Sequence, residues 1–371
     1  MGGAPIWFAR CAGYETAVGA LERLLAESGL LNADSLRRRR VLVKPNLLTD
    51  RTPEQAVTTH PELLRAVLRH LKSAGANVSV GDSPASTANL RAVLEKSGVG
   101  AVCGEEGVPF VSFEGAGTRN FDQDGFSFSL ARPVVEADLI VNLPKVKSHS
   151  LTKLTAAVKN LYGAVPGYSK TTLHRLYPKP STFGRLLQAI WRVLPPSVSI
   201  ADGVVGMEGQ GPANGTPVRL GFIAASSNPF ALDRAICETL HIKPDAVPYL
   251  KGLCDATAND VRGDRIEIDS FSTPSGAHIL SVLPAWFTHF AAKLLWVRPS
   301  FDAVRCIACG QCARACPAKA LTENEHTAPT LDGKTCIGCA CCHEVCPKGA
   351  IRMMQSPVLR MARVFRGEWI T

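Results

Sequence analysis

The stretch Arg39-Arg-Val-Leu-Val-Lys-Pro-Asn46 indicates the fold of most of the chain. Its apolar run Val41–Val43 is continuous, which is typical of a strand buried on both faces of a sheet. A helical pattern follows from His60 to Ala74, where leucine and valine residues recur three and four positions apart. A second strand is expected at Asn77–Val80. The order strand, helix, strand predicts a parallel unit whose helix packs on the sheet.

The same alternation continues to residue 225 and predicts an α/β fold, a largely parallel sheet with helices on both faces. Further strands are expected at 108–113, 138–143, 198–201 and 218–225, and further helices at 88–96, 151–161 and 183–194. The predicted organisation is an α/β domain over 1–275, a helical bridge over 276–299, a small cysteine-rich domain over 300–352 and a short amphipathic tail over 353–371.

The composition sets limits on function. Of the 371 residues, 46% are hydrophobic and 20% charged, so the chain can bury a sizeable core. The net charge of +9 favours anionic partners, but no basic and aromatic module predicts nucleic-acid binding. The first residues lack the pattern of a signal peptide, and the apolar segment 277–299 is interrupted by charged residues and proline. We therefore expect a cytoplasmic protein with no membrane span; a surface-lying helix at 277–299 stays an alternative.

Nine of the 13 cysteines lie between Cys306 and Cys346. They form two repeats of the pattern C-x2-C-x2-C-x3-C-P, which begin at Cys306 and Cys336. The pattern matches the bacterial two-cluster ferredoxins and predicts two [4Fe–4S] clusters. Zinc is the alternative, since C-x2-C pairs also bind zinc, but two complete four-cysteine repeats that each end in Cys-Pro favour clusters.

The resemblance to these ferredoxins implies that the fourth cysteine of each repeat binds the cluster of the other repeat. Cluster 1 is then held by Cys306, Cys309, Cys312 and Cys346, and cluster 2 by Cys336, Cys339, Cys342 and Cys316. Cys341 lies off the repeat and is expected to bind neither cluster. The scattered cysteines are expected to be small buried apolar residues; they are Cys11, Cys103, Cys237 and Cys254.

Polar segments follow four of the predicted strands: Lys44-Pro45-Asn46, Asp82-Ser83-Pro84, Lys145–His149 and Asp202-Gly203. Because ligands bind at the carboxyl ends of parallel strands, we expect these segments to meet at one rim of the sheet. Several cationic side chains at one rim suit a carboxylate or phosphate group. The sequence therefore predicts a site for a small anionic substrate.

The candidate catalytic residues are Lys145, Lys147, His149 and Lys159. His149 is the expected proton donor or acceptor, since histidine titrates near physiological pH. The candidate binding residues are Lys44, Asn46, His60, Asp82, Asn160, Asp202 and Glu208. A structural role stays open: the lysines after the strands could solvate a sheet edge, His149 could bond a loop carbonyl and Asp82 could cap a turn.

The large domain resembles the DUF362 family. The resemblance lies in Val43–Leu47, Thr59-His60-Pro61, Gly81–Pro84, Leu143–His149, Leu154–Gly163, Ala201-Asp202-Gly203 and Met207–Pro212. It implies a shared fold, often with an added two-cluster ferredoxin module, but no single reaction. A more distant likeness, of fold alone, is to the nickel-pincer lactate racemases, and no motif here carries over their catalytic residues.

These features lead to the hypothesis of an iron–sulfur oxidoreductase. Electrons would pass from a ferredoxin- or flavodoxin-type redox partner through the two clusters to a small anionic substrate in the α/β domain. One alternative is an electron-transfer protein with no catalysis of its own. Another is a racemase-like metal-cofactor enzyme in which the clusters are accessory.

Overall fold

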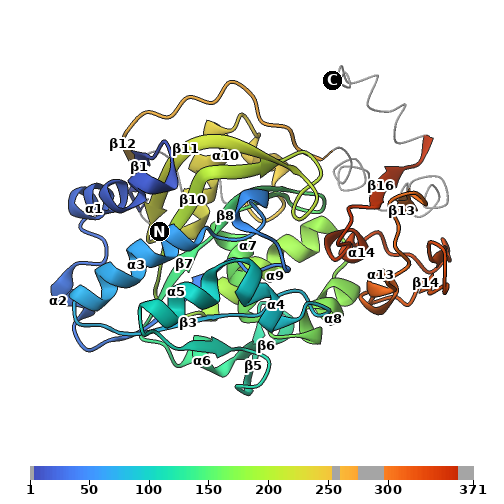
Figure 1. Ribbon diagram of the computed structural model, residues 1–371, viewed down its shortest axis with the longest axis horizontal. Coiled ribbons are helices and arrows are strands. Elements are labelled where there is room, and N and C mark those ends of the chain that lie inside the picture. Colours follow the sequence, from blue (N-terminus) through green and yellow to red (C-terminus); the bar gives the residue numbers. More distant parts are fainter. Residues whose placement is uncertain (1–3, 253–259, 275–295, 358–371) are drawn as a thin grey trace.

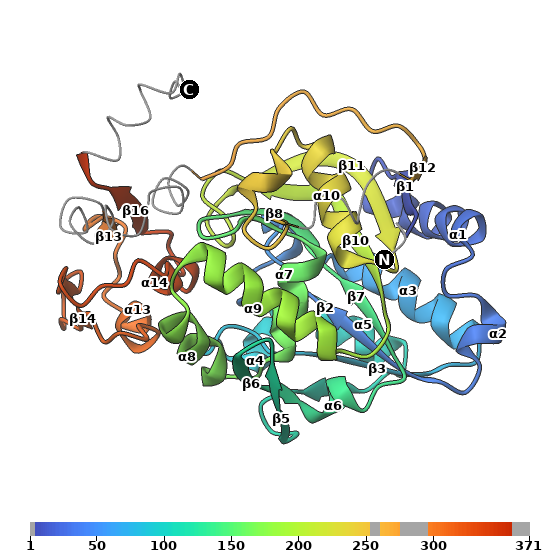
Figure 2. The same cartoon turned by 180° about the vertical axis from the view of Figure 1, so that it is seen from behind.

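The structure is a computed structural model that describes residues 4–252, 260–274 and 296–357. Its larger part is a mixed, mostly parallel sheet of ten strands with helices on both sides (Figures 1 and 2). The strand order is β12-β1-β11-β10-β7-β2-β3-β4, and β8 and β9 extend the sheet beside β10. The predicted α/β fold is therefore confirmed.

The elements of this domain have the following bounds. The strands of the sheet are β1 (Ile6–Arg10), β2 (Arg40–Pro45), β3 (Asn77–Asp82), β4 (Phe110–Ser112), β7 (Leu139–Leu143), β8 (Lys145–His149), β9 (Lys153–Thr155), β10 (Ser197–Glu208), β11 (Thr216–Ser226) and β12 (Val261–Gly263). A separate hairpin is formed by β5 (Thr118–Gln123) and β6 (Phe126–Ala131). The helices are α1 (Ala17–Ser28), α2 (Ala33–Leu36), α3 (Pro61–Ser73), α4 (Leu90–Lys96), α5 (Val99–Glu105), α6 (Arg132–Val135), α7 (Ala157–Leu161), α8 (Tyr168–Leu176), α9 (Pro180–Val193) and α10 (Pro229–Thr239).

Two apolar cores lie on the two faces of the sheet. In β2, Val41 and Val43 belong to the core that also contains buried side chains of α1, α3 and α5. Leu42 belongs to the other core, with side chains of α7, α9 and α10. Figure 1 shows α3 and α5 in front of the sheet, and Figure 2 shows α9 and α10 in front of its other face. Because successive side chains point to opposite faces and both faces are covered, Val41, Leu42 and Val43 are all apolar.

The structure differs from the sequence prediction between residues 145 and 176. Lys145–His149, expected as a polar loop, is strand β8, which pairs in parallel with β10 and antiparallel with β9. Because β9 takes Lys153–Thr155, the helix expected over 151–161 begins only at Ala157. Helix α8, in the basic stretch after residue 161, was not among the expected elements. Partners distant in sequence stabilise these polar strands, and local patterns do not reveal such partners.

The cysteine-rich part, called here the dicluster module (residues 297–355), lies at one end of the domain, near α8 (Figure 1). Strands β13 (Val297–Phe301) and β16 (Ile351–Gln355) pair antiparallel and bring its two ends together. Between them lie α13 (Gln311–Arg314), the short pair β14 (Leu321–Thr322) and β15 (Thr330–Leu331), and α14 (Cys341–Glu344). Gly310 and Ala340, 30 residues apart, precede the two helices with φ of 67° and 63°. The internal repeat of the sequence is thus a repeat of structure.

Parts of the predicted organisation lie outside the described residues. The helical bridge over 276–299 falls mostly in the undescribed range 275–295, and 297–299 belong to β13. Of the tail over 353–371, residues 358–371 are undescribed and 353–355 belong to β16. In the ranges that the structure does describe, no helix has the length and apolar character needed to cross a bilayer.

The start of helix α7 is held by a carboxylate from α10. Asp233 is completely buried; its Oδ1 accepts a hydrogen bond from the amide of Ala157 at 2.6 Å and its Oδ2 one from Val158 at 3.0 Å. The first amides of a helix have no partner within the helix, so a distant residue satisfies them here. Asp233 therefore fixes the position of α7 on the sheet.

We predict that Asp233→Asn lowers the free energy of unfolding by about 1–3 kcal/mol, because the amide nitrogen cannot accept a hydrogen bond and leaves a buried N–H unpaired. Denaturant unfolding of the protein with both clusters present measures the effect. The exposed Glu27→Gln on α1 is the matched control and should leave the stability unchanged. Equal stability of the two variants would contradict the prediction.

Candidate functional site

Hydrogen bonds attach the dicluster module to the α/β domain. Arg51 donates from its guanidinium to the carbonyl oxygens of Cys346 at 3.2 Å and Pro347 at 2.9 Å. Asn214 donates from its side-chain amide to the carbonyl oxygen of His343 at 2.9 Å. These bonds go to backbone atoms beside the predicted cluster ligands, so they hold the module in a defined place.

A pocket lies between the two parts of the molecule and is called here the interdomain pocket. It encloses about 680 Å³ of empty space, which includes solvent at its mouth. Its polar side chains from the α/β domain include Lys44, Asn46, Asp82, Lys159, Asn160, Tyr162, Lys170 and His174. From the dicluster module come Ala315, Cys341, Glu344 and Val345. The pocket therefore lies at the carboxyl ends of β2 and β3, as the position of their polar segments predicts.

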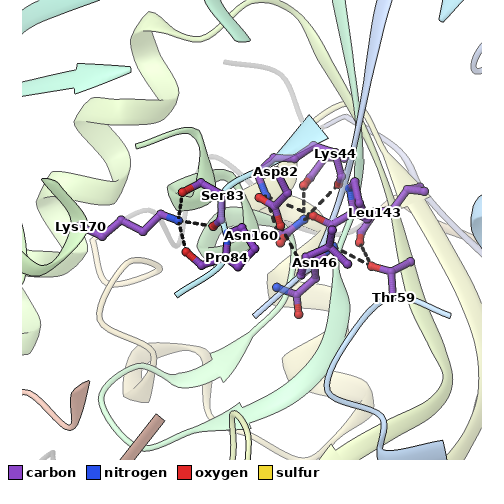
Figure 3. A network of polar contacts seen from close by, with 12 residues as sticks. Lys44, Asn46, Thr59, Asp82, Ser83, Pro84, Leu143, Asn160 and Lys170 are labelled. Atoms are coloured by element: carbon purple, nitrogen blue, oxygen red, sulfur yellow. Dashed lines mark hydrogen bonds and ion pairs between the residues drawn. The ribbon is translucent and has the colours of Figure 1, made fainter. Parts of the chain in front are cut away.

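A buried ion pair joins the ends of β2 and β3. Lys44 Nζ lies 2.6 Å from Asp82 Oδ1, and both side chains are almost fully buried (Figure 3). Burial lowers the pKa of Lys44, while the charge of Asp82 opposes this shift. Asp82 Oδ2 also accepts a hydrogen bond from the amide of Leu47 at 2.8 Å. A side chain at Gly163 would put Cβ 2.5 Å from Lys44 Nζ, so only glycine permits this approach.

Lys170 of α8 reaches the loop that follows β3. Its Nζ donates to Ser83 Oγ at 2.7 Å, to the carbonyl oxygen of Pro84 at 3.0 Å and to the carbonyl oxygen of Ser83 (Figure 3). Burial lowers the pKa of Lys170 to about 7. Because Lys170 binds this loop, α8 is held along one side of the interdomain pocket.

Lys145 is fully buried and belongs to a separate network. Its Nζ donates to Asp202 Oδ2 at 2.7 Å, to the hydroxyl of Tyr14 at 2.7 Å and to the carbonyl oxygen of Val205 at 3.0 Å. The other carboxylate oxygen of Asp202 accepts from Tyr14, and Oδ2 also accepts from the amide of His60 at 2.9 Å. All three ammonium hydrogens of Lys145 thus have a partner, and the group does not line the interdomain pocket.

Lys147 and His149 follow on the same face of β8. Lys147 Nζ donates to the carbonyl oxygen of Val57 at 2.7 Å, and burial lowers the pKa of this lysine to about 7. His149 Nδ1 accepts from the amide of Leu151 at 3.0 Å, while its Nε2 lies 3.2 Å from Glu344 Oε1. His149 is therefore a contact between the α/β domain and the dicluster module.

The structure divides the predicted site residues into groups. Those that line the interdomain pocket are Lys44, Asn46, Asp82, Lys159 and Asn160. Those that do not line it are Lys145, Lys147, His149, His60, Asp202 and Glu208. Glu208 instead accepts a hydrogen bond from the amide of Ser272 at 2.8 Å near the surface. The sequence predicted one site at a single rim, but the predicted residues belong to more than one polar network.

The predicted site residues do not include three polar residues of the pocket, namely Tyr162, Lys170 and His174. Lys170 and His174 are four residues apart on α8, so they lie on one face of that helix. This spacing is the signal that was available in the sequence, although no helix was expected there.

The structure brings cysteines of the two repeats together. Cys306, Cys309, Cys312 and Cys346 line one cavity of about 450 Å³, which joins three cysteines of the first repeat to the fourth of the second. In return, Cys316 lies close enough to act electrostatically on Cys336 and Cys342. The exchange of the fourth ligand between the two repeats stays a prediction.

The remaining cysteines agree with the sequence interpretation as far as they are described. Cys11, Cys103 and Cys237 are buried, and Cys254 lies outside the described residues. Cys341 is also buried, but it lines the interdomain pocket between the predicted ligands Cys339 and Cys342.

We predict that Cys309→Ser lowers the iron content by about one cluster, that is about four irons per chain, because serine does not replace a thiolate ligand well. Iron and acid-labile sulfide are measured on protein purified without oxygen. Cys341→Ser is the matched control in the same module and should keep the full iron content. Unchanged iron in Cys309→Ser, or an equal loss in Cys341→Ser, would contradict the ligand assignment.

We predict that Lys145→Met destabilises the fold by about 3–5 kcal/mol, because it leaves the buried carboxylate of Asp202 without its counter-ion. Denaturant unfolding measures this loss. The double variant Lys145→Met/Asp202→Asn should recover part of the stability, since it removes the uncompensated charge. A stable Lys145→Met protein would show that the pair is not needed for folding.

Comparisons with known proteins agree with this division of the chain. The family described as "Domain of unknown function (DUF362)" matches residues 41–238, and the "4Fe-4S dicluster domain" family matches residues 300–353. The dicluster match confirms the prediction of two [4Fe–4S] clusters.

One curated relative is the "Thylakoid-associated protein sll1697" of Synechocystis, 39% identical over 213 residues. The matched region is 57% of this chain and 66% of the relative. Among solved structures, the lactate racemase apoprotein of Thermoanaerobacterium thermosaccharolyticum is 16% identical with a TM-score of 0.42, over 65% of this chain and 57% of that one. A protein of Thermotoga maritima is 15% identical with a TM-score of 0.39, over 61% of this chain and 58% of that one. The DUF362 match covers more than half of the residues of this chain. The chain therefore belongs to the DUF362 family, with a dicluster domain after it.

Proposed function

We propose that the protein is an oxidoreductase whose two [4Fe–4S] clusters pass electrons to a small anionic substrate in the interdomain pocket. One observation supports this above the others: three of the four residues that the dicluster module contributes to the pocket wall directly precede predicted cluster ligands. Val345 precedes Cys346 of predicted cluster 1, and the other two border predicted cluster 2. Cys341 precedes the ligand Cys342, and Ala315 precedes the ligand Cys316. A substrate in the pocket would therefore lie beside cluster 2, where one-electron transfer needs no large movement.

The charges of the pocket support an anionic substrate. Lys44, Lys159 and Lys170 line it from the α/β domain. Of the four residues predicted to be catalytic, Lys159 is the one that lines this pocket. A catalytic role for Lys145, Lys147 and His149 stays a prediction, and the proposed reaction does not depend on it.

We also propose that electrons enter at cluster 1, from a redox partner of the ferredoxin or flavodoxin type. Val304 and Ile307, on either side of the ligand Cys306, expose 96% and 56% of their surface. Cys339 and Cys342 of cluster 2 are buried, by contrast. Exposed apolar side chains beside a cluster suit a short-lived protein contact. The cytoplasmic location stays a prediction.

We predict that a small anion will reoxidise the dithionite-reduced protein, and that Ser86→Phe will slow this at least tenfold, because a phenyl ring occupies pocket space without removing a charged group. The measurement is the visible absorbance of the clusters, followed without oxygen against a panel of small carboxylates, phosphate and sulfite. The rate with a protein electron acceptor such as cytochrome c is recorded in parallel and should not change.

Thr118→Phe on the exposed hairpin is the matched control, since it adds the same ring at an exposed residue that does not line the pocket. If cytochrome c reoxidises the protein but no member of a broad anion panel does, the protein is an electron carrier and the proposed activity is wrong. A substrate whose rate is the same in Ser86→Phe and wild type would place the reaction outside the interdomain pocket.

A further inference from the structure

Lys159 differs from the other lysines of the interdomain pocket because it has no acidic partner. Lys44 pairs with Asp82, and Lys170 donates to oxygen atoms of the loop after β3. Lys159 Nζ instead lies 4.8 Å from the ring centre of Tyr162 and 5.5 Å from that of Phe183. In the described part of the chain, no carboxylate lies within ion-pair distance of it.

The surroundings of Lys159 leave its charge available to a ligand. Burial lowers its pKa, and the largest opposing influence is the carboxylate of Glu344, which also lines the pocket. Aromatic faces attract an ammonium group more weakly than a carboxylate at hydrogen-bond distance does. An anion that enters the pocket would therefore find a partly desolvated cation without a competing partner.

His174 packs against the same two rings, and the three residues Tyr162, His174 and Phe183 are called here the aromatic wall. Its ring stacks on Phe183 with centres 4.4 Å apart and meets the edge of Tyr162 at 5.6 Å. The side chain is only 4% exposed, and its Nδ1 has no hydrogen-bond partner among the described residues. Buried polar atoms are rarely left without a partner, so this nitrogen is available to a bound molecule.

The protonation state of His174 follows from its surroundings. Burial, together with the nearby charge of Lys159, lowers its pKa to about 3. The ring is therefore neutral at physiological pH, and in the tautomer with the proton on Nδ1 it can donate one hydrogen bond. Such a neutral donor beside the ammonium group of Lys159 suits a carboxylate. One carboxylate oxygen can pair with the ammonium group, and the other can accept the hydrogen bond.

The charge count of the pocket limits the ligand further. Its charged lining residues are three lysines (Lys44, Lys159 and Lys170) and two carboxylates (Asp82 and Glu344). With Lys170 protonated, they leave a single positive charge, which matches a monoanion better than a dianion. The lining also includes apolar residues, among them Leu47, Leu48 and Val345, which can cover a short hydrocarbon group.

We infer that Lys159 and His174 form a carboxylate-binding subsite, and that the substrate of this pocket is a monocarboxylate with a short apolar body. The substrate carboxylate pairs with Lys159 Nζ and accepts a hydrogen bond from His174 Nδ1. The apolar body then points toward Leu47 and Val345. This inference rests on the proposed function only in using the same pocket, because it concerns binding and includes no electron transfer.

Calorimetric titration of the protein with both clusters, kept without oxygen, tests the subsite with two probes, propionate and inorganic phosphate. We expect propionate to bind with one site per chain and more tightly than phosphate. Lys159→Gln should weaken propionate binding about 10-fold to 100-fold, as expected for loss of a charged hydrogen bond. His174→Phe keeps the aromatic stacking and should weaken it about 3-fold to 10-fold.

Lys348→Gln, on the surface of the dicluster module, is the control for loss of a lysine charge and should bind propionate as wild type does. Iron content and the unfolding midpoint show which variants fold. If His174→Phe does not fold, His174→Asn replaces it. In either case, propionate binding by Lys159→Gln tests the subsite. Absence of propionate binding, tighter binding of phosphate, or unchanged binding in Lys159→Gln would overturn the inference.

The proposed function and the subsite can fail separately. Propionate binding that depends on Lys159, together with no anion that reoxidises the clusters, would leave the subsite in place and remove the oxidoreductase activity. Reoxidation by a substrate at the same rate in wild type, Lys159→Gln and His174→Phe would keep the activity and remove the subsite.

Discussion

The buried ion pair between Lys44 and Asp82 is the interaction on which the site depends. Two charges at the ends of neighbouring strands lose their hydration on folding, and their attraction offsets this loss only if the remaining polar atoms find partners. The amide of Leu47 and the side chain of Asn160 supply such partners, so they fix the loop after β2 and the end of α7. Gly163 packs directly against the pair, and a Cβ at this position would collide with both side chains. The pair thus determines the arrangement of three segments around the pocket.

Helix α7 transmits this constraint to the aromatic wall. Asp233 holds its first amides, and near its other end Asn160 donates to Asn142 Oδ1 at 2.8 Å on β7. A five-residue helix has little stability of its own, so these side chains from other elements position it. Lys159 lies between the two attachments, and its ammonium group is therefore directed by the fold rather than by a partner carboxylate.

The sequence and the structure agree where the evidence is local and differ where it is not. The apolar runs of β2 and β7 and the spacing of the cysteines are local patterns, and they predicted the sheet and the cluster domain. The polar residues of β8 could not be placed this way, since the partner of Lys145 is 57 residues away on β10. A lysine after a strand has the same local sequence whether it pairs with a buried aspartate or faces a substrate. His174 was passed over for a related reason, because its meaning depends on Phe183 and Tyr162 beside it.

The interdomain pocket is complete only when the dicluster module is in place. The α/β domain supplies the lysines and the aromatic wall, but Ala315, Cys341, Glu344 and Val345 form the opposite side. Arg51 and Asn214 bind backbone carbonyls of the module, and such bonds hold the position of the chain whatever side chains it carries. His149 adds a side-chain contact to Glu344, a residue that itself lines the pocket. Docking of the module and formation of the site are therefore one event, so a change that loosens the module alters the pocket and the surroundings of cluster 2 together.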